Sequence, residues 1–368
     1  MENNKNHIAY FCPSLSWGGL EMTLLKNANW MHNRGHRVLI FVQQGSRIHQ
    51  EAEALEMKVD FVKAHKKYYD FINASRLIKK LKKHQISHLV FSDPKDMSIC
   101  AMAKTWSTRK FFLAYFAGMQ IGIPKRDLLH TLRYNSLDLW SCLLPWLKKQ
   151  VNELTRFPEV KTKVIPPGLV LEKYFNAPPA LEAKQLLKLD VSKKFIGLVG
   201  RFDEQKRQLL LLESFNQIKN ETSHNLVFLG EPTHGESEDY FEKLKNFVKL
   251  NNLENRVHFI PFRKDVETFY AALDVFVMAT NSETFGMVTI EAMASGCKIV
   301  GSNKGGTVEI LNHGELGDLF ESGDANDLAK KLMLSITNEN FDPNRNRQAA
   351  KKYDSEIFCD KVEIALGL

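Results

Sequence analysis

The residues best suited to chemistry are two glutamates, Glu283 and Glu291, which stand eight positions apart. The apolar run LDVFVM, residues 273–278, precedes them and is typical of a buried parallel strand. Small and apolar residues from 286 onwards favour a helix, which Gly296 ends as a C-cap, and residues 298–300 form the next strand. The pattern therefore places Glu283 at the carboxyl end of a strand, the edge at which open α/β sheets bind ligands.

The loop and helix around these glutamates favour a phosphate and a sugar as ligands. Gly286 lets the main chain approach a ligand closely, and a helix N-terminus offers free N–H groups that suit phosphate. A carboxylate in the first turns of a helix can accept hydrogen bonds from two sugar hydroxyls. Glu291 could instead be a solvated helix residue, but the neighbouring Ala292, Met293 and Ala294 argue against an exposed face.

Two cations follow another predicted strand. Residues 195–200 form an apolar run that ends in Gly200, Arg201 comes next, and Lys206 follows five residues later. Arg presents a fork of donors that matches phosphate oxygens, and Lys adds a mobile point charge. Ordinary surface charge is the alternative, although an Arg directly after a buried Gly is not typical of it. Arg201 and Lys206 therefore favour a phosphate ligand, and because the chain has no Asp-x-Asp motif, no metal is expected.

The run ETFGMVTIEAMASG, residues 283–296, closely resembles the signature of the retaining GT-B glycosyltransferases of family 4, the group 1 family. The match continues into GGTVEI at residues 305–310, and Gly18-Gly19 after the first strand is similar to the family pattern. The segment GRFDEQK, residues 200–206, resembles the family's second signature, in which the Arg and the Lys bind the diphosphate of a nucleotide sugar. The match is specific because these parts come in order.

This resemblance implies an α/β GT-B fold, in which two Rossmann-like domains face each other across a cleft and a C-terminal helix crosses back to the first domain. The implied domains are an acceptor domain of residues 1–168 with the helix 353–368, and a donor domain of residues 169–352. The implied catalytic residues are Glu283, on the transferred sugar, and Arg201 and Lys206, on the diphosphate. The implied donor-binding residues are Gly18, Gly19, Arg263, Phe285, Gly286, Met287, Val288 and Glu291.

The chain departs from the family pattern where members frequently place a His near the transferred sugar. Residues 117–120 are AGMQ instead, and Gln120 can donate and accept hydrogen bonds but cannot act as a general acid or base. Gln120 and Asp93 are therefore candidate acceptor or sugar contacts. His130 falls on the following helix, where we expect a structural role. Arg207 stands where the family usually has Gly.

The implied activity is retaining transfer of a sugar from a UDP- or GDP-linked donor to a saccharide or lipid-linked acceptor, in cell-surface polysaccharide or glycolipid synthesis. Neither a cofactor nor nucleic acid is expected. Because no carboxylate is assigned as a nucleophile, attack on the leaving-group face is preferred. Two alternatives stay open: an epimerase or phosphorylase of the same architecture, and a non-catalytic protein that binds nucleotide sugars or membranes.

Length and composition suit this interpretation. A chain of 368 residues predicts two domains, and its first half alternates strand and helix patterns as doubly wound folds do. No run approaches the ~20 apolar residues of a membrane span, and the polar N-terminus leads straight into a strand without the pattern of a signal peptide. Five scattered Cys without metal spacing predict reduced thiols and a cytoplasmic location.

Charge is distributed unevenly along the chain. Residues 1–165 hold 26 Lys and Arg against 13 Asp and Glu, an excess of +13, whereas the remainder carries −6. The asymmetry favours an anionic partner for the first half, such as the inner face of a membrane, although it also suits simple solubility. The basic helix 75–84, with Lys79, Lys80, Lys82 and Lys83, and the segment 143–157 beside Trp140 are the candidate surfaces; packing on the sheet is the alternative for both.

Overall fold

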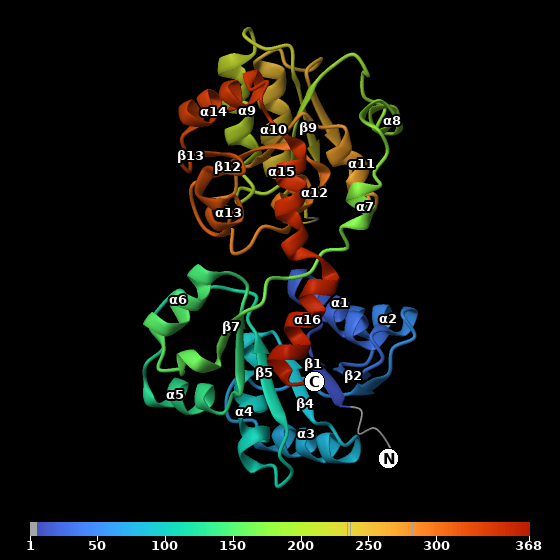
Figure 1. Ribbon diagram of the computed structural model, residues 1–368, viewed down its shortest axis with the longest axis vertical. Helices are drawn as coiled ribbons and strands as arrows, with labels where there is room; N and C mark the ends of the chain where they lie inside the picture. Colours follow the sequence, from blue (N-terminus) through green and yellow to red (C-terminus); the bar gives the residue numbers. More distant parts are fainter. Residues whose placement is uncertain (1–5, 234, 236, 282) are drawn as a thin grey trace. The chain divides into compact units, whose positions relative to one another are not determined.

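The computed structural model describes residues 6–368 except 234, 236 and 282. The chain divides into two compact units, one of Met1–Gly168 with Ser355–Leu368 and the other of Leu169–Asp354. Each unit is a parallel sheet with helices between successive strands (Figure 1). No helix among the described residues has the length and apolar character needed to cross a bilayer.

The first unit contains a seven-stranded sheet in the order β3-β2-β1-β4-β5-β6-β7, and every pairing is parallel. The order reverses between β1 and β4, so this is the switch point of a doubly wound sheet. The strands are β1 (His7–Cys12), β2 (Arg37–Val42), β3 (Val59–Phe61), β4 (His88–Phe91), β5 (Phe112–Phe116), β6 (Leu139–Cys142) and β7 (Thr162–Val164). The helices are α1 (Gly19–Asn33), α2 (Arg47–Ala54), α3 (Phe71–Lys83), η1 (Pro94–Asp96), α4 (Met97–Trp106), α5 (Leu128–Asn135), α6 (Pro145–Leu154), η2 (Glu159–Lys161) and α16 (Ser355–Leu366).

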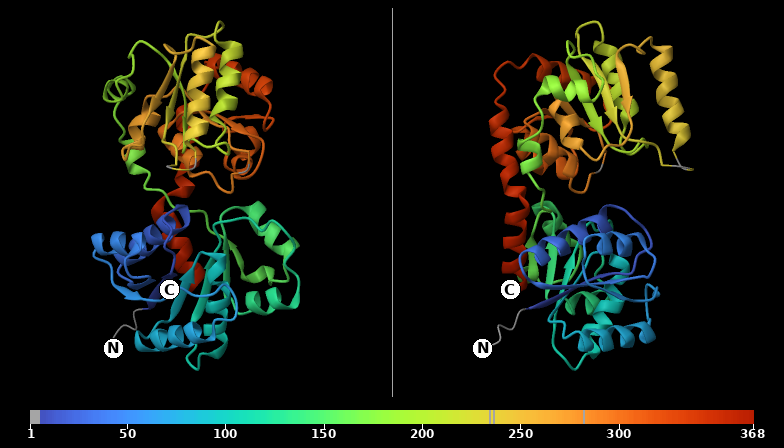
Figure 2. Two further views of the ribbon diagram at one scale, coloured as in Figure 1. Left: turned by 180° about the vertical axis from the view of Figure 1, so that it is seen from behind. Right: turned by 90° about the vertical axis from the view of Figure 1, so that its right-hand side faces the viewer.

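The C-terminal helix α16 packs on the first unit, beside α1 (Figure 2). Arg34, the C-cap residue of α1, binds the carboxylates of Glu356, Asp360 and Glu363 at 2.6–2.9 Å. A Cβ on Gly168 would lie 2.9 Å from both Phe358 and Trp30, so only glycine lets the chain pass this close to the helix. The return of the C-terminal helix to the first domain is thereby confirmed.

The second unit contains a six-stranded parallel sheet in the order β10-β9-β8-β11-β12-β13, with its switch point between β8 and β11. The strands are β8 (Phe195–Val199), β9 (Asn225–Leu229), β10 (Val257–Ile260), β11 (Val275–Met278), β12 (Lys298–Ser302) and β13 (Asp318–Phe320). The helices are α7 (Glu172–Phe175), α8 (Ala180–Leu186), α9 (Gln208–Ile218), α10 (Glu238–Leu250), α11 (Val266–Ala271), α12 (Met287–Ser295), α13 (Gly306–Ile310), η3 (Asn312–Gly314), α14 (Ala325–Thr337), α15 (Pro343–Ala350) and η4 (Lys351–Tyr353).

The predicted strands are present within two residues of their expected bounds, but three observed strands, β6, β7 and β13, were not predicted. β7 and β13 have three residues each, too few for a periodic pattern. The polar residues 176–194 are helical only in α8, because Pro178 and Pro179 precede this helix and Lys188, with φ +56°, follows it. The basic helix 75–84 belongs to α3, which buries Ala74, Leu77 and Leu81 in the unit and leaves Lys79, Lys82 and Lys83 exposed.

Candidate functional site

The two predicted chemical clusters of the second unit meet at its switch point. Arg201 and Lys206 follow β8, Glu283 follows β11, and these strands are neighbours in the sheet. Lys206 Nζ lies 3.0 Å from Glu283 Oε2 across a sequence separation of 77 residues, and the two side chains are 27% and 22% exposed. The sheet order therefore brings a cation and a carboxylate together at a half-buried position where ligands of such sheets bind.

Glycines fix the main chain around Glu283. Gly286 has φ +101° as the N-cap of α12, a backbone conformation that side chains disfavour. Gly305 has φ +64°, and a Cβ there would lie 2.3 Å from the carbonyl oxygen of Glu283. Gly306 N–H donates to that same oxygen at 2.8 Å. The Gly305-Gly306 turn after β12 therefore holds the Glu283 loop in place. This explains why Gly286 and the Gly305-Gly306 pair occur in one sequence pattern.

The N-terminus of α12 and the exposed Arg201 both favour binding of an anion beside Glu283. The N-cap residue of α12 is Gly286, which has no side chain to cap the helix, and the first N–H groups of α12 point out of the helix beside Glu283. The Arg201 side chain is 65% exposed and loosely held, with Nη1 donating to Thr233 Oγ1 at 3.3 Å and Nη2 lying 3.6 Å from Asp203. Arg201 is consequently able to turn to a ligand at the strand end.

Arg207 occupies a left-handed conformation, with φ +56°. This accounts for the family's usual Gly at the position, since glycine adopts such a conformation without strain. The Arg207 guanidinium lies against the turn at Gly323, where an added Cβ would approach Nη1 to 2.8 Å.

Glu291 is not the solvated helix residue that the sequence left open. It lies in the second turn of α12, partly buried, and Tyr270 Oη donates a hydrogen bond to Glu291 Oε2 at 2.9 Å. Burial, with the nearby charge of Glu291, raises the pKa of Tyr270 well above its usual range. Tyr270 therefore stays a neutral donor that orients the Glu291 carboxylate.

Two other predicted donor residues have partners within the chain. Arg263 makes a bidentate pair with Asp265, at 3.0 and 2.6 Å, which leaves less of its guanidinium for a base. Phe285 is buried at 4% exposure, and its ring lies 5.8 Å from that of Tyr353 in an edge arrangement. Phe285 thus supports the loop from beneath, while Met287 and Val288 follow it in the first turn of α12.

In the first unit, the predicted residues also lie at the carboxyl edge of the sheet. Gly18 and Gly19 open α1 directly after the loop that follows β1, as expected, and Gly18 N–H donates to Glu21 Oε2 at 3.0 Å. Asp93 follows β4 and caps η1, with Oδ1 accepting from Lys95 N–H at 2.8 Å.

Asp93 and Gln120 line the same cavity, whose volume is about 370 Å³. His130, expected to be structural, lines it too and binds the N-cap residue Asp127 at 2.5 Å. Sequence reasoning did not single out Lys67 and Tyr68, which form another wall. The run of two Lys and two Tyr at residues 66–69, in the loop between β3 and α3, was the signal that could have identified them.

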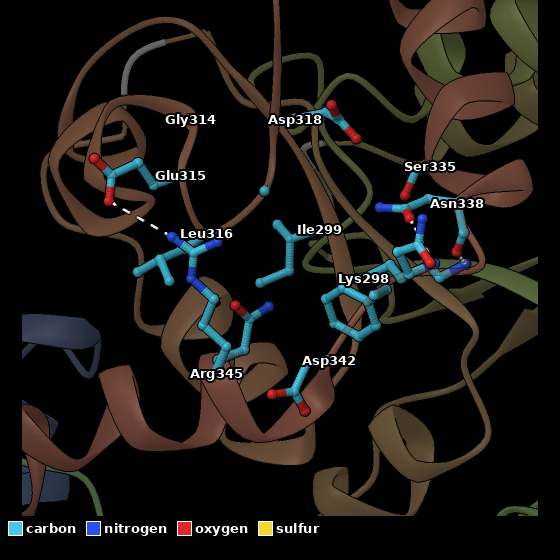
Figure 3. Close-up of a pocket in the computed structure, with 14 residues that line it drawn as sticks. Lys298, Ile299, Gly314, Glu315, Leu316, Asp318, Ser335, Asn338, Asp342 and Arg345 are labelled. Carbon is cyan, nitrogen blue, oxygen red and sulfur yellow. Dashed lines mark hydrogen bonds and ion pairs between the residues drawn. The ribbon is translucent and has the colours of Figure 1, made fainter.

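A second cavity, of about 270 Å³, lies in the second unit at the amino ends of β12 and β13 (Figure 3). Lys298 Nζ donates to the Asn338 carbonyl at 2.7 Å, and Arg345 lies 3.7 Å from Glu315 (Figure 3). Because Glu283 and the α12 N-terminus are at the carboxyl ends of the strands, this cavity is at the opposite edge of the sheet and is separate from the site described above.

Two glycosyltransferase family models match this chain. Residues 17–173 match the family model "Glycosyltransferase Family 4", and residues 181–353 match the model "Glycosyl transferases group 1". One relative is the lipopolysaccharide core biosynthesis mannosyltransferase LpsB of Rhizobium meliloti, with 30% identity over 42% of this chain and 44% of that protein. The chain spans half or less of the length of this relative and of two other curated relatives that it matches.

Two solved structures share the fold over nearly the whole chain. A glycosyltransferase from Rickettsia africae has a TM-score of 0.86 at 19% identity and covers 98% of both chains. Anabaena Alr3699/HepE in complex with UDP has a TM-score of 0.84 at 20% identity, covering 98% of this chain and 99% of that one. At such identities the likeness concerns the fold alone. With both domain models matched in order and the GT-B fold in place, the chain belongs to the group 1 glycosyltransferases.

Proposed function

We propose that the protein is a retaining glycosyltransferase that moves a sugar from a nucleoside-diphosphate sugar to a saccharide or lipid-linked acceptor. The observation that carries this proposal is the Lys206–Glu283 pair at the switch point, beside the N-terminus of α12, whose N-cap residue is Gly286. A UDP-linked donor is the first candidate because HepE was solved with UDP, and a GDP-linked donor is the second.

Cations and main-chain amides would stabilise the departing diphosphate. As the bond between the anomeric carbon and the diphosphate breaks, negative charge grows on the phosphate oxygens, and donors already aimed at that position lower the barrier. Lys206 is held by Glu283 before the donor arrives, and Arg201 is loosely held nearby. We expect these charges to serve without a metal ion.

Glu283 would orient the transferred sugar rather than attack it. A double displacement needs a carboxylate free to bond to the anomeric carbon, whereas Glu283 shares its charge with Lys206 at 3.0 Å. We infer retention by attack of the acceptor on the leaving-group face. Glu291, already oriented by Tyr270, would accept hydrogen bonds from the ribose hydroxyls of the donor. Gly286, Met287 and Val288 would contribute main-chain contacts to the same donor.

The biological setting is part of the proposal. The role of LpsB in lipopolysaccharide core biosynthesis supports a role for this protein in cell-surface polysaccharide or glycolipid synthesis. The excess of +13 in residues 1–165 supports a cytoplasmic protein peripheral to the inner face of a membrane.

Mass spectrometry of the protein incubated with a pool of nucleotide sugars and an acceptor panel would test the function. The expected result is release of one nucleoside diphosphate with a matching gain of one sugar by an acceptor, with the anomeric configuration kept. Donor turnover without acceptor, or only with phosphate, would indicate an epimerase or phosphorylase. Tight donor binding without hydrolysis or transfer would indicate a non-catalytic binding protein.

A further inference from the structure

The cavity at the amino ends of β12 and β13, here called the rear pocket, is built from three segments of the second unit (Figure 3). They are residues 298–299 at the start of β12, residues 314–318 around the start of β13, and residues within 335–346, from the end of α14 into α15. The volume of about 270 Å³ approaches the ~300 Å³ at which pockets for small ligands begin. Because the rear pocket and Glu283 are at opposite edges of the sheet, the proposed transfer reaction gives this cavity no role.

The walls of the rear pocket are held together by contacts within the unit. Lys298 Nζ donates to the Asn338 carbonyl at 2.7 Å and so ties the start of β12 to the end of α14. Asn346 is 1% exposed, and its Nδ2 donates at 3.1 Å to the main-chain carbonyl just before β12. A Cβ on Gly317 would lie 2.7 Å from the Ile299 carbonyl oxygen, so glycine lets the loop pass close to the strand. The rear pocket is therefore formed before a ligand arrives.

Asp318 presents a carboxylate to the rear pocket that has no hydrogen-bond partner among the residues that the structure describes. The side chain is half-buried, and burial raises the pKa of Asp318 although the charge of Lys331 opposes the change. A half-buried carboxylate without hydrogen bonds makes the folded state less stable. Groups that cost stability in this way are frequent in binding sites, where a ligand supplies the missing partners. Asp318 therefore favours a ligand that donates hydrogen bonds.

The remaining polar groups of the rear pocket are a mixture of donors and acceptors. The charged groups are three carboxylates and two cations, namely Glu315, Asp318, Asp342, Lys298 and Arg345. The small excess of negative charge disfavours an anion, whereas the two cations disfavour a second ammonium group. The amides of Asn338 and Asn340 can each donate and accept. Hydroxyl groups also donate and accept, so a neutral ligand with several hydroxyls matches this set of partners.

Phe341 gives the rear pocket an aromatic wall beside these polar groups. Its side chain is half-buried, and Ile299 and Leu316 add further apolar surface. The face of an aromatic ring carries partial negative charge, which attracts polarised C–H groups. A sugar ring has C–H groups on its faces and hydroxyls around its edge. The combination of one aromatic ring with a carboxylate and amides therefore suits a sugar better than an apolar ligand or an open polyol chain.

We propose that the rear pocket binds one neutral sugar unit, whose hydroxyls donate to Asp318 and whose C–H face packs against Phe341. The proposal goes beyond the transfer reaction and does not depend on it, because no residue of the rear pocket belongs to the site at Glu283. A sugar in the rear pocket would leave the N-terminus of α12 free for a nucleotide. The protein would thus hold a saccharide at a second place, away from the reacting groups.

Saturation-transfer NMR of the full chain with free sugars tests the proposal. The probes are glucose, galactose, mannose and N-acetylglucosamine, each added alone and titrated to give a dissociation constant. At least one of them should receive saturation from the protein, most strongly at the C–H groups that face Phe341. Absence of transfer to all four sugars overturns the proposal.

Asp318→Ala assigns the bound sugar to the rear pocket. It should weaken binding about tenfold, because hydrogen bonds to a charged group are lost. Its melting temperature should stay the same or rise, since a half-buried carboxylate without hydrogen bonds is removed. The matched control is Asp239→Ala, which removes a carboxylate from an exposed position on α10 of the same unit and should bind as the unaltered protein does. Binding by Asp318→Ala within twofold of the unaltered protein overturns the proposal.

Asn340→Ala decides the question if Asp318→Ala does not fold. Asn340 is exposed in the loop before α15, so its replacement leaves the fold intact, and binding of the sugar should weaken several-fold. Unchanged binding by Asn340→Ala would then overturn the proposal. Displacement of the sugar by UDP would place it at the site beside Glu283 and would also overturn the proposal. Failure of the proposed function would appear instead as absence of donor turnover with sugar binding unchanged.

Discussion

Removing the Lys206 ammonium should reduce transfer strongly while leaving the protein folded. Lys206 Nζ lies 3.0 Å from Glu283, at the strand end where we place the diphosphate. Loss of one donor that stabilises developing charge costs about 2–4 kcal/mol of transition-state stabilisation, or roughly 30- to 1,000-fold in rate. Lys206→Ala also leaves the negative charge of Glu283 without its partner, which adds repulsion toward a diphosphate.

The effect on folding should be small. Both side chains of the pair are more than a fifth exposed, and ion pairs with this much solvent contact contribute about 1 kcal/mol or less to stability. A fall in activity without a matching fall in melting temperature would therefore report on the site rather than on the fold.

The assay is release of the nucleoside diphosphate and sugar gain by the acceptor, followed for the unaltered protein, Lys206→Ala, Arg201→Ala and a control. Lys184→Ala is a suitable control, because Lys184 lies on α8 of the same unit, where its ammonium donates to the Lys193 carbonyl and lies 5.7 Å from the centre of the Phe195 ring. Phe195 begins β8, so this contact is at the opposite end of the strand from Lys206. Arg201→Ala should also lose about 2–4 kcal/mol. Activity of either site variant within twofold of the unaltered protein would refute the diphosphate clamp.

Three further outcomes are expected. Activity should survive EDTA, because the clamp is built from side-chain cations; complete loss in chelator with recovery on adding magnesium or manganese would contradict this. Changing Lys79, Lys80, Lys82 and Lys83 to Gln should weaken binding of the protein to anionic vesicles at low salt, because each basic residue near an anionic surface contributes about 1 kcal/mol. Calorimetry should show that the affinity for the donor is unchanged. Burial raises the pKa of Asp96 to about 6 from 3.8, so the folded state holds this proton more tightly than the unfolded state does. The free energy of unfolding should therefore fall as pH rises from 3.8 to about 6. Denaturant titrations of Asp96→Asn should lack this fall, and a parallel pH profile for the two proteins would contradict the assignment.

Local patterns in the sequence were sufficient for the elements that carry the chemistry of the second unit. The apolar run before Glu283, the glycines at 286 and 296 and the intervening small residues predicted β11, α12 and β12, and each element is present. These predictions succeed because strand burial, helix caps and left-handed glycines depend on neighbours within a few residues. The resemblance to the family rests on the same local runs.

Contacts between distant segments were decided by the tertiary structure. Lys206 and Glu283 were predicted separately, and their pairing depends on β8 and β11 being neighbours in the sheet. The Tyr270 hydroxyl on Glu291 and the Asp265 carboxylate on Arg263 change what those two residues can offer a ligand. No periodic pattern encodes such side-chain partners, because they depend on packing geometry.

A hollow in the first unit illustrates the same limit. Tyr68, Trp106 and Arg133 come from three separate segments, and each alone fits an ordinary surface or helix residue. Their common hollow arises because α3, α4 and α5 pack in succession on one unit.

The sequence by itself determined the two α/β units and the residue types at their strand ends, since these follow from burial and backbone preference. The order of the strands and the packing of the helices decided which of those residues share a site, because that outcome depends on free energies summed over the whole fold.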